Sequence, residues 1–223
     1  AFNNCRSLTS INIPDSVTSI GGSAFYACSN LTSISIPDSV TSIGDSAFNN
    51  CRSLTSINIP DSVTKIGGSA FLSCSSLTSI NIPNSVTSIG GFAFCGCSSL
   101  TSVNIPDGVT KIGVYAFYDC NSLTSINIQG RVTNIGGYTF SGCSSLTSIG
   151  IPNSVTSIEY YAFVDCSNLK DVYYYGSQEE WSKISIKDGN TCLTDAAIHY
   201  IFNEAGAKTA PKITTNETYT GGN

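Results

Sequence analysis

Apolar and polar residues follow one another along this chain in a pattern that returns every 23 residues. Each period carries a leucine, an isoleucine, an isoleucine-proline pair, a valine, an isoleucine-glycine pair, an alanine-phenylalanine pair and a cysteine, with polar residues and glycine between them. The phenylalanine column shows the step: Phe2, Phe25, Phe48, Phe71, Phe94, Phe117, Phe140 and Phe163. A strict period of about 20–50 residues is the signature of stacked repeats. We therefore expect a solenoid, which is one elongated body.

The first part of each repeat predicts a β-strand. In the repeat that spans residues 54–76, Ile57 and Ile59 alternate with polar residues, as in a strand with one buried face. Pro60 ends this strand, because proline cannot donate to a hydrogen-bond ladder. A turn follows, in which Asp61 can bond to nearby backbone amides.

The rest of the repeat predicts a second extended piece and a bend. Val63 and Ile66 bracket the extended piece, and two glycines follow. Phe71 and Cys74 then have the spacing of one helical or 3₁₀ turn. None of these segments can bury its apolar face alone, so stacked repeats must share one continuous core.

Eight of the ten cysteines form a column with the same step: Cys5, Cys28, Cys51, Cys74, Cys97, Cys120, Cys143 and Cys166. Stacked residues point their Cβ atoms in parallel, which suits a disulfide poorly. We expect buried free thiols, with disulfides as the alternative. Cys95 and Cys192 lie outside the column. Neither their spacing nor the single histidine, His199, predicts a metal site, and no cofactor is expected.

The pattern divides the chain into three parts. Residues 1–168 are predicted to form the repeats, 169–202 a C-terminal capping unit, and 203–223 a polar tail or linker. Within the cap, Ser177 and Glu180 fit a capping box before a short helix that carries Trp181. Residues 184–186 and 196–202 are expected to be strands. The chain begins within a repeat, so further repeats are expected to precede it.

Composition excludes several partners. Charged residues make up 11% of the chain and its net charge is −5, so no basic footprint for nucleic acid is present. No apolar run approaches the roughly 20 residues that a membrane helix needs, and membrane insertion is not expected. We expect a monomer.

The repeated motif resembles the BspA-like class of leucine-rich repeats of bacterial secreted and surface proteins. Residues 31–51 match it position by position, and residues 172–181 with 198–200 resemble the closing unit of such proteins. The resemblance implies a right-handed leucine-rich solenoid, an extracellular or cell-surface location, and adhesion to a host or matrix protein or glycan. It implies no catalytic residues. Gln129-Gly130-Arg131 departs from the motif and predicts an irregular rung around residues 129–139.

One column changes character partway along the chain. This column lies two residues after the glycine of the isoleucine-glycine pair. It holds serine in three successive repeats and then aromatic residues: Phe92, Tyr115, Tyr138 and Tyr161. These rings are candidates for stacking on sugars or packing against a partner protein. The alternative is a structural ladder that shields the turn. Tyr173, Tyr175 and Trp181 in the cap are candidates to continue the aromatic region, with closure of the core as the alternative.

Two polar columns have structural explanations as well as functional ones. The strand face is rich in Thr, Ser and Asn, and is either a solvated sheet or a repetitive binding surface. Asp15, Asp38, Asp61 and Asp107 share a turn column, for which turn chemistry competes with calcium binding.

The residues predict a binding module and no enzyme. With many serines and one histidine, a catalytic triad cannot be assigned from sequence, because a triad is recognised by its geometry. The first hypothesis is an extracellular module that recognises a protein or glycan. The alternatives are a passive spacer and a scaffold that targets an enzyme domain outside this chain.

Overall fold

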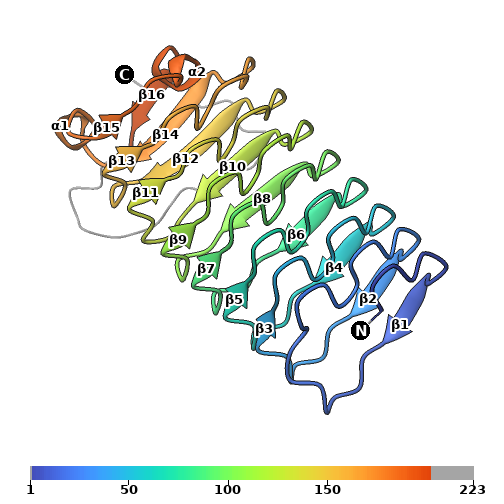
Figure 1. The fold of residues 1–223 in the computed structure, drawn as a ribbon. Coiled ribbons are helices and arrows are strands. Elements are labelled where there is room, and N and C mark those ends of the chain that lie inside the picture. Colours follow the sequence, from blue (N-terminus) through green and yellow to red (C-terminus); the bar gives the residue numbers. More distant parts are fainter. Residues whose placement is uncertain (1, 202–223) are drawn as a thin grey trace, which may run out of the picture.

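The computed structural model describes residues 2–201, which form an elongated stack of rungs with one repeat per rung (Figure 1). Strands pair in parallel with their equivalents in neighbouring repeats, so that Ser125 pairs with Ser148 and Ile126 with Ile149. The prediction of a solenoid is confirmed. The predicted tail, 203–223, lies outside the described residues.

The first side of the stack is the main sheet. Its seven parallel strands are β4 (Ser56–Asn58), β6 (Ser79–Asn81), β8 (Ser102–Ile105), β10 (Ser125–Ile128), β12 (Ser148–Pro152), β14 (Asp171–Tyr175) and β16 (Ala197–Tyr200). The pair β1 (Ser10–Asn12) and β2 (Ser33–Ser35) precedes them in the same row in Figure 1. The strands bury their isoleucines and expose the residues on either side, as the alternation predicts.

The second side carries very short strands. One sheet contains β3 (Ser42–Ile43), β5 (Lys65–Ile66), β7 (Ser88–Ile89) and β9 (Lys111–Ile112), and another contains β11 (Asn134–Ile135), β13 (Ser157–Ile158) and β15 (Ser185–Ile186). The break between β9 and β11 falls at the rung for which the sequence predicts an irregularity. The proline-containing turn is replaced there by Gln129-Gly130-Arg131.

The third side is a run of turns, and it differs from the single helical turn that the spacing predicts. Two residues in each repeat have positive φ, for example Ser69 at 55° and Ser73 at 59°. Some backbone amides therefore bond to the next rung and others within their own. Phe71 N–H donates to the Ala93 carbonyl of the next rung at 2.8 Å, whereas Cys74 N–H donates to the Phe71 carbonyl of the same rung at 3.1 Å. Hydrogen bonds between rungs thus run along all three sides.

The core is a set of continuous columns. The phenylalanine rings stack from Phe2 to Phe163 with centroid separations of 5.2–5.6 Å. The leucines from Leu31 to Leu146 and the valines from Val40 to Val132 are fully buried beside them. Aromatic stacking adds about 0.5–1.5 kcal/mol per pair to the burial of apolar area.

The cysteine column consists of free thiols, which confirms the prediction. Each Sγ from Cys28 to Cys166 lies 2.9–3.2 Å from the carbonyl oxygen of the phenylalanine one rung before, to which the thiol donates. Burial raises the pKa of Cys51 and of Cys166 to about 12, and raises those of Cys74 and Cys97 further. The column is thus a chain of neutral donors.

The cap closes the C-terminal end. Helix α1 (Gln178–Trp181) has the predicted capping box, with reciprocal bonds between Ser177 and Glu180. Helix α2 (Thr191–Thr194) was not predicted from the sequence. Neither α1 nor α2, the helices of residues 2–201, has the length and apolar character needed to cross a membrane.

The side chain of Asn190 replaces the backbone carbonyl that the next rung supplies elsewhere in the stack. In the repeats, the phenylalanine amide donates to the carbonyl of the residue before the next phenylalanine of the column, as Phe140 does to Ala162. At the last rung the Phe163 amide donates instead to Oδ1 of buried Asn190, at 3.0 Å. Its Nδ2 donates to the carbonyls of Glu159 and Lys187 at 2.9 and 2.7 Å.

Replacing Asn190 by alanine is expected to lower the free energy of unfolding by about 1–3 kcal/mol, because it leaves buried backbone groups unsatisfied. Chemical denaturation measures this change. The exposed Asn121, replaced in the same way, is the control and should change stability by less than about 0.5 kcal/mol. An equal effect of the two substitutions would contradict the capping role.

The cysteine column is expected to resist alkylation in the folded protein. At pH 8 the raised pKa values keep the buried sulfurs protonated, and only the thiolate reacts. Mass spectrometry after timed exposure to iodoacetamide should show Cys192, which is half-buried, labelled well before Cys97. In denaturant all ten should react. Comparable labelling of the two cysteines in the folded state would refute the assignment.

Candidate binding surfaces

The aromatic column lies in the turns of the third side. Phe92, Tyr115, Tyr138 and Tyr161 have φ angles of 57–59°. This region costs a residue with a side chain about 1–2 kcal/mol, and bulky residues rarely adopt it. Serine occupies the equivalent position in the earlier rungs. Four aromatic residues in succession at a strained position point to a role beyond the turn itself.

These four side chains form a stacked row, which we call the aromatic ladder. The centroids of Phe92 and Tyr115 are 4.6 Å apart, those of Tyr115 and Tyr138 4.7 Å, and those of Tyr138 and Tyr161 5.3 Å. The first two pairs are within 4° of parallel. The ladder therefore exists as the sequence predicts.

The stacking decides which part of each ring meets solvent. The faces of Tyr115 and Tyr138 are covered by their neighbours in the ladder. The outer face of Tyr161 is covered by the cap, where a Cβ on Gly189 would overlap its ring. A sugar stacks on a ring face, so Tyr115, Tyr138 and Tyr161 do not offer the sugar platform that their spacing suggested, and only Phe92, which follows Ser69 in the column, keeps a face without a ring partner. The row is partly open to solvent, since Phe92 and Tyr161 are exposed and Tyr115 and Tyr138 are half-buried.

Two exposed apolar residues widen the ladder. Phe92 and Tyr161 are 40% and 41% exposed, and Val114 and Tyr160, which precede ladder residues, are 48% and 50% exposed. Val114 and Tyr160 occupy a position that is glycine in most other repeats. Large exposed apolar groups gathered in this way are typical of interaction sites.

Tyr173 and Tyr175 do not continue the ladder. They lie in β14, on the main sheet, and the turn and second strand of the rung separate them from it. Tyr175 donates its hydroxyl to Asn127 Oδ1 at 2.9 Å, and burial raises its pKa to about 12. Tyr173 stacks on His199 at 5.0 Å. Of the two explanations for the cap aromatics, continuation of the ladder is not what the structure places here, because the cap strand that carries Tyr173 and Tyr175 extends the main sheet and not the turns.

Trp181 has the structural role. Its ring packs edge-on against that of Tyr174 at 5.1 Å, and Tyr174 is almost completely buried. The pair closes the apolar core under helix α1.

The threonine hydroxyl groups of the main sheet form hydrogen bonds to backbone carbonyls of the sheet itself. The threonine that opens each rung, from Thr32 to Thr147, donates its hydroxyl to the carbonyl of the preceding threonine at 3.0–3.5 Å. The structural explanation of this column is thus supported by direct bonds. The aspartates of the turn column are exposed. Within residues 2–201 no three His, Cys, Asp or Glu side chains are placed to hold a metal ion.

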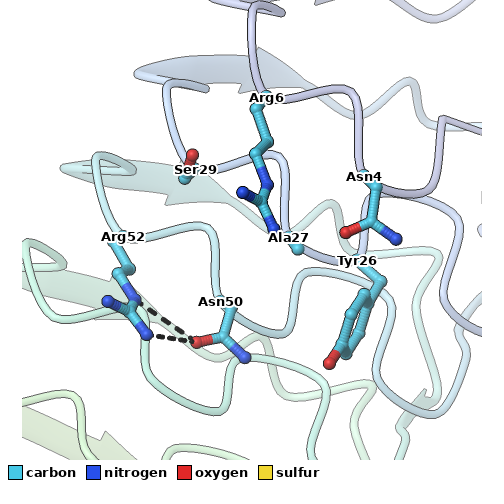
Figure 2. Close-up of a pocket in the computed structure, with 7 residues that line it drawn as sticks. All are labelled: Asn4, Arg6, Tyr26, Ala27, Ser29, Asn50 and Arg52. Atoms are coloured by element: carbon cyan, nitrogen blue, oxygen red, sulfur yellow. Dashed lines mark hydrogen bonds between the residues drawn. The ribbon is translucent and has the colours of Figure 1, made fainter.

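The structure contains a polar hollow that was not predicted from the sequence. It has a volume of about 350 Å³, lies in the turns of the first three rungs, and is lined by Asn4, Arg6, Tyr26, Ser29, Asn50 and Arg52 (Figure 2). The signal in the sequence was weak: arginine replaces serine or asparagine at two places in one column. Only the stacking brings these residues together.

Comparison with known proteins settles the family. A family model for the BspA type leucine rich repeat region, which contains six copies, matches residues 1–98 and 64–192. The chain belongs to the BspA-type leucine-rich repeat family. Among curated proteins no match was found.

Solved structures agree with this family. A leucine-rich repeat protein of T. pallidum is 32% identical, with 72% of this chain and 78% of that chain covered and a TM-score of 0.67. The pneumococcal vaccine antigen PcpA is 18% identical over 85% of this chain and 40% of its own, with a TM-score of 0.52, which shows the fold alone. A leucine-rich cell surface protein of Faecalibacterium prausnitzii is 24% identical over 82% and 83%, with a TM-score of 0.42.

Replacing Tyr138 by serine should destabilise this BspA-type repeat by about 1–3 kcal/mol, because two ring pairs are lost at about 0.5–1.5 kcal/mol each. Serine is accepted at this φ in Ser69, so the backbone should not change. Urea denaturation measures the effect, and Tyr138→Phe, which keeps the stacking, is the control. Equal stability of both variants would show that stacking contributes nothing.

Proposed function

We propose that this protein is a non-catalytic binding module that works outside the cell or on its surface, and that it recognises a protein partner through the aromatic ladder. One observation carries the proposal. The ladder holds four aromatic residues at strained backbone positions, in a stack that covers both faces of its inner rings and leaves the row partly exposed to solvent.

The exposed edges favour a protein over a glycan. The edge of an aromatic ring carries partial positive charge, and it attracts carbonyl oxygens and the faces of other aromatic rings. The hydroxyl groups of Tyr115, Tyr138 and Tyr161 add donors along the same line. A protein surface supplies both kinds of group, whereas a neutral sugar needs an open ring face.

The rigidity of the solenoid supports the same function. Backbone bonds between rungs fix the turns, as in the 3.0 Å bond from the Phe92 amide to the Val114 carbonyl. Side chains that are already ordered lose little entropy when a partner binds. A rigid apolar row between polar turns therefore suits recognition.

The arrangement around His199 supports a non-catalytic role. Its Nε2 lies 2.7 Å from Asp171 Oδ1, and its ring stacks on Tyr173 on the exposed face of the main sheet. Within residues 2–201 no serine hydroxyl or cysteine thiol hydrogen-bonds to the imidazole, as a nucleophile and base would.

The extracellular location rests on the family, and the thiols are compatible with it. Oxidation proceeds through the thiolate. The buried column holds its cysteines in the neutral form, since burial raises their pKa values. Such free thiols can persist in an oxidising medium.

The test places charge in the ladder surface without removing a ring. The variant Val114→Asp/Tyr160→Asp leaves all four ladder residues in place, and Asp45 shows that the column accepts aspartate. The probes are a panel of purified matrix proteins and a panel of neutral glycans, measured by surface plasmon resonance. We expect a matrix protein to bind the unmodified chain, and the variant to bind it at least about tenfold more weakly, because desolvating two carboxylates costs more than about 1.4 kcal/mol.

The matched control is Ser56→Asp/Ser102→Asp, which adds the same charge on the exposed main sheet, in a column where Asp171 occurs naturally. It should bind as the unmodified chain does. Binding to neutral glycans alone, or equal weakening in both variants, would refute recognition through the ladder. The absence of any binding would favour the passive spacer, or the scaffold that targets a separate enzyme domain.

A further inference from the structure

The hollow of the first three rungs carries positive charge that the protein itself does not neutralise. Arg6 and Arg52 are two of the three arginines in a chain whose net charge is −5. Neither forms an ion pair within residues 2–201, and no carboxylate lines the hollow. An arginine offers a fixed fork of donors that matches carboxylate and sulfate geometry.

The repeat sets the spacing of the two guanidinium groups. Arg6 and Arg52 occupy the same column two rungs apart, which is about 10 Å along the stack. The rung between them carries Ser29 in that column, and its small side chain leaves the space open. Figure 2 shows the Arg6 guanidinium beside Ala27 and the Arg52 guanidinium beside Asn50, both on the wall of the hollow.

Hydrogen bonds hold one side of the hollow in place. Asn50 Oδ1 accepts from Nε and Nη2 of Arg52 at 3.3 and 3.2 Å. Asn50 Nδ2 donates to Asn49 Oδ1 at 2.8 Å. Arg52 is thereby oriented while its Nη1 donor stays available. Arg6 makes no side-chain hydrogen bond within residues 2–201, so its guanidinium donors are not used by the described part of the chain.

Tyr26 differs from the rings of the ladder. Its neighbours in its own column are Asn3 and Asn49, and within residues 2–201 it forms no ring pair. Tyr26 is half-buried, so part of it meets solvent. The hollow thus offers what the ladder lacks, which is an aromatic face that no other ring covers, beside unpaired cations.

We propose that this hollow binds an acidic saccharide. The carboxylate or sulfate group lies between Arg6 and Arg52, and the sugar ring packs on Tyr26. Oδ1 of Asn4, whose Nδ2 donates to Asn3, can accept from a sugar hydroxyl on the same wall. A volume of about 350 Å³ suits one or two sugar units. This site is separate from the ladder, which begins two rungs further along the stack.

The experiment is isothermal titration calorimetry of the full chain with three hexasaccharides. Hyaluronan offers carboxylates, heparin offers carboxylates and sulfates, and maltohexaose is neutral. We expect at least one acidic hexasaccharide to bind and the neutral one not to bind. Tight binding of hyaluronan assigns the carboxylate as the recognised group, and binding of heparin alone assigns the sulfate.

The repeat supplies variants that should fold. Serine occupies the arginine column in Ser29, and asparagine occupies the Tyr26 column in Asn49, so Arg6→Ser, Arg52→Ser and Tyr26→Asn each introduce a residue already used there. Each arginine variant should weaken binding at least about tenfold, and Tyr26→Asn about threefold or more.

Arg131→Ser is the matched control, because it removes the same charge from an exposed turn outside the hollow and restores the serine found at Ser154. Its affinity should equal that of the unmodified chain, as should that of Val114→Asp/Tyr160→Asp. Thermal unfolding of every variant checks the fold. The proposal is overturned if neither acidic hexasaccharide binds, if Arg131→Ser weakens binding as much as Arg6→Ser, or if tripolyphosphate displaces the saccharide equally well from the unmodified chain and from Tyr26→Asn.

Discussion

Every feature of this molecule depends on the hydrogen bonds that join each rung to the next. On the main sheet Thr78 N–H donates to the Thr55 carbonyl at 3.1 Å, and on the third side Phe71 N–H donates to the Ala93 carbonyl at 2.8 Å. The bonds hold identical positions in columns. A column can then be filled only by a residue that packs on a copy of itself, which explains the stacked phenylalanines and the cysteine thiols.

This constraint makes any change within a column informative. Most core columns keep one residue type from the first rung to the last because stacking demands it. The column of Ser69 becomes aromatic at Phe92, and the column of Ser29 becomes arginine at Arg52. Neither change is needed for packing, since the earlier or later rungs fold with serine. The first change coincides with a surface of exposed apolar side chains, and the second with a hollow whose arginines form no ion pair within residues 2–201. The two surfaces lie on different rungs of the same side.

Repetition made much of the fold predictable. The strands, the free thiols, the capping box at Ser177 and the irregular rung near residue 130 follow from spacing and residue type, and all are present. The helical turn predicted at Phe71 was replaced by turns with positive φ, because the amides there bond to the next rung. Spacing alone does not reveal the direction of a hydrogen bond.

The sequence by itself determined the repeat, its register and the columns that form the core, because a constant period leaves one way to stack identical segments. Only the tertiary structure decided how those columns face solvent. It covered both faces of the inner ladder rings and left the row partly exposed. It placed Tyr173 and Tyr175 on another side from Tyr161, and it gathered Arg6, Tyr26 and Arg52 around one hollow. These outcomes depend on distances between rungs and on the direction of side chains.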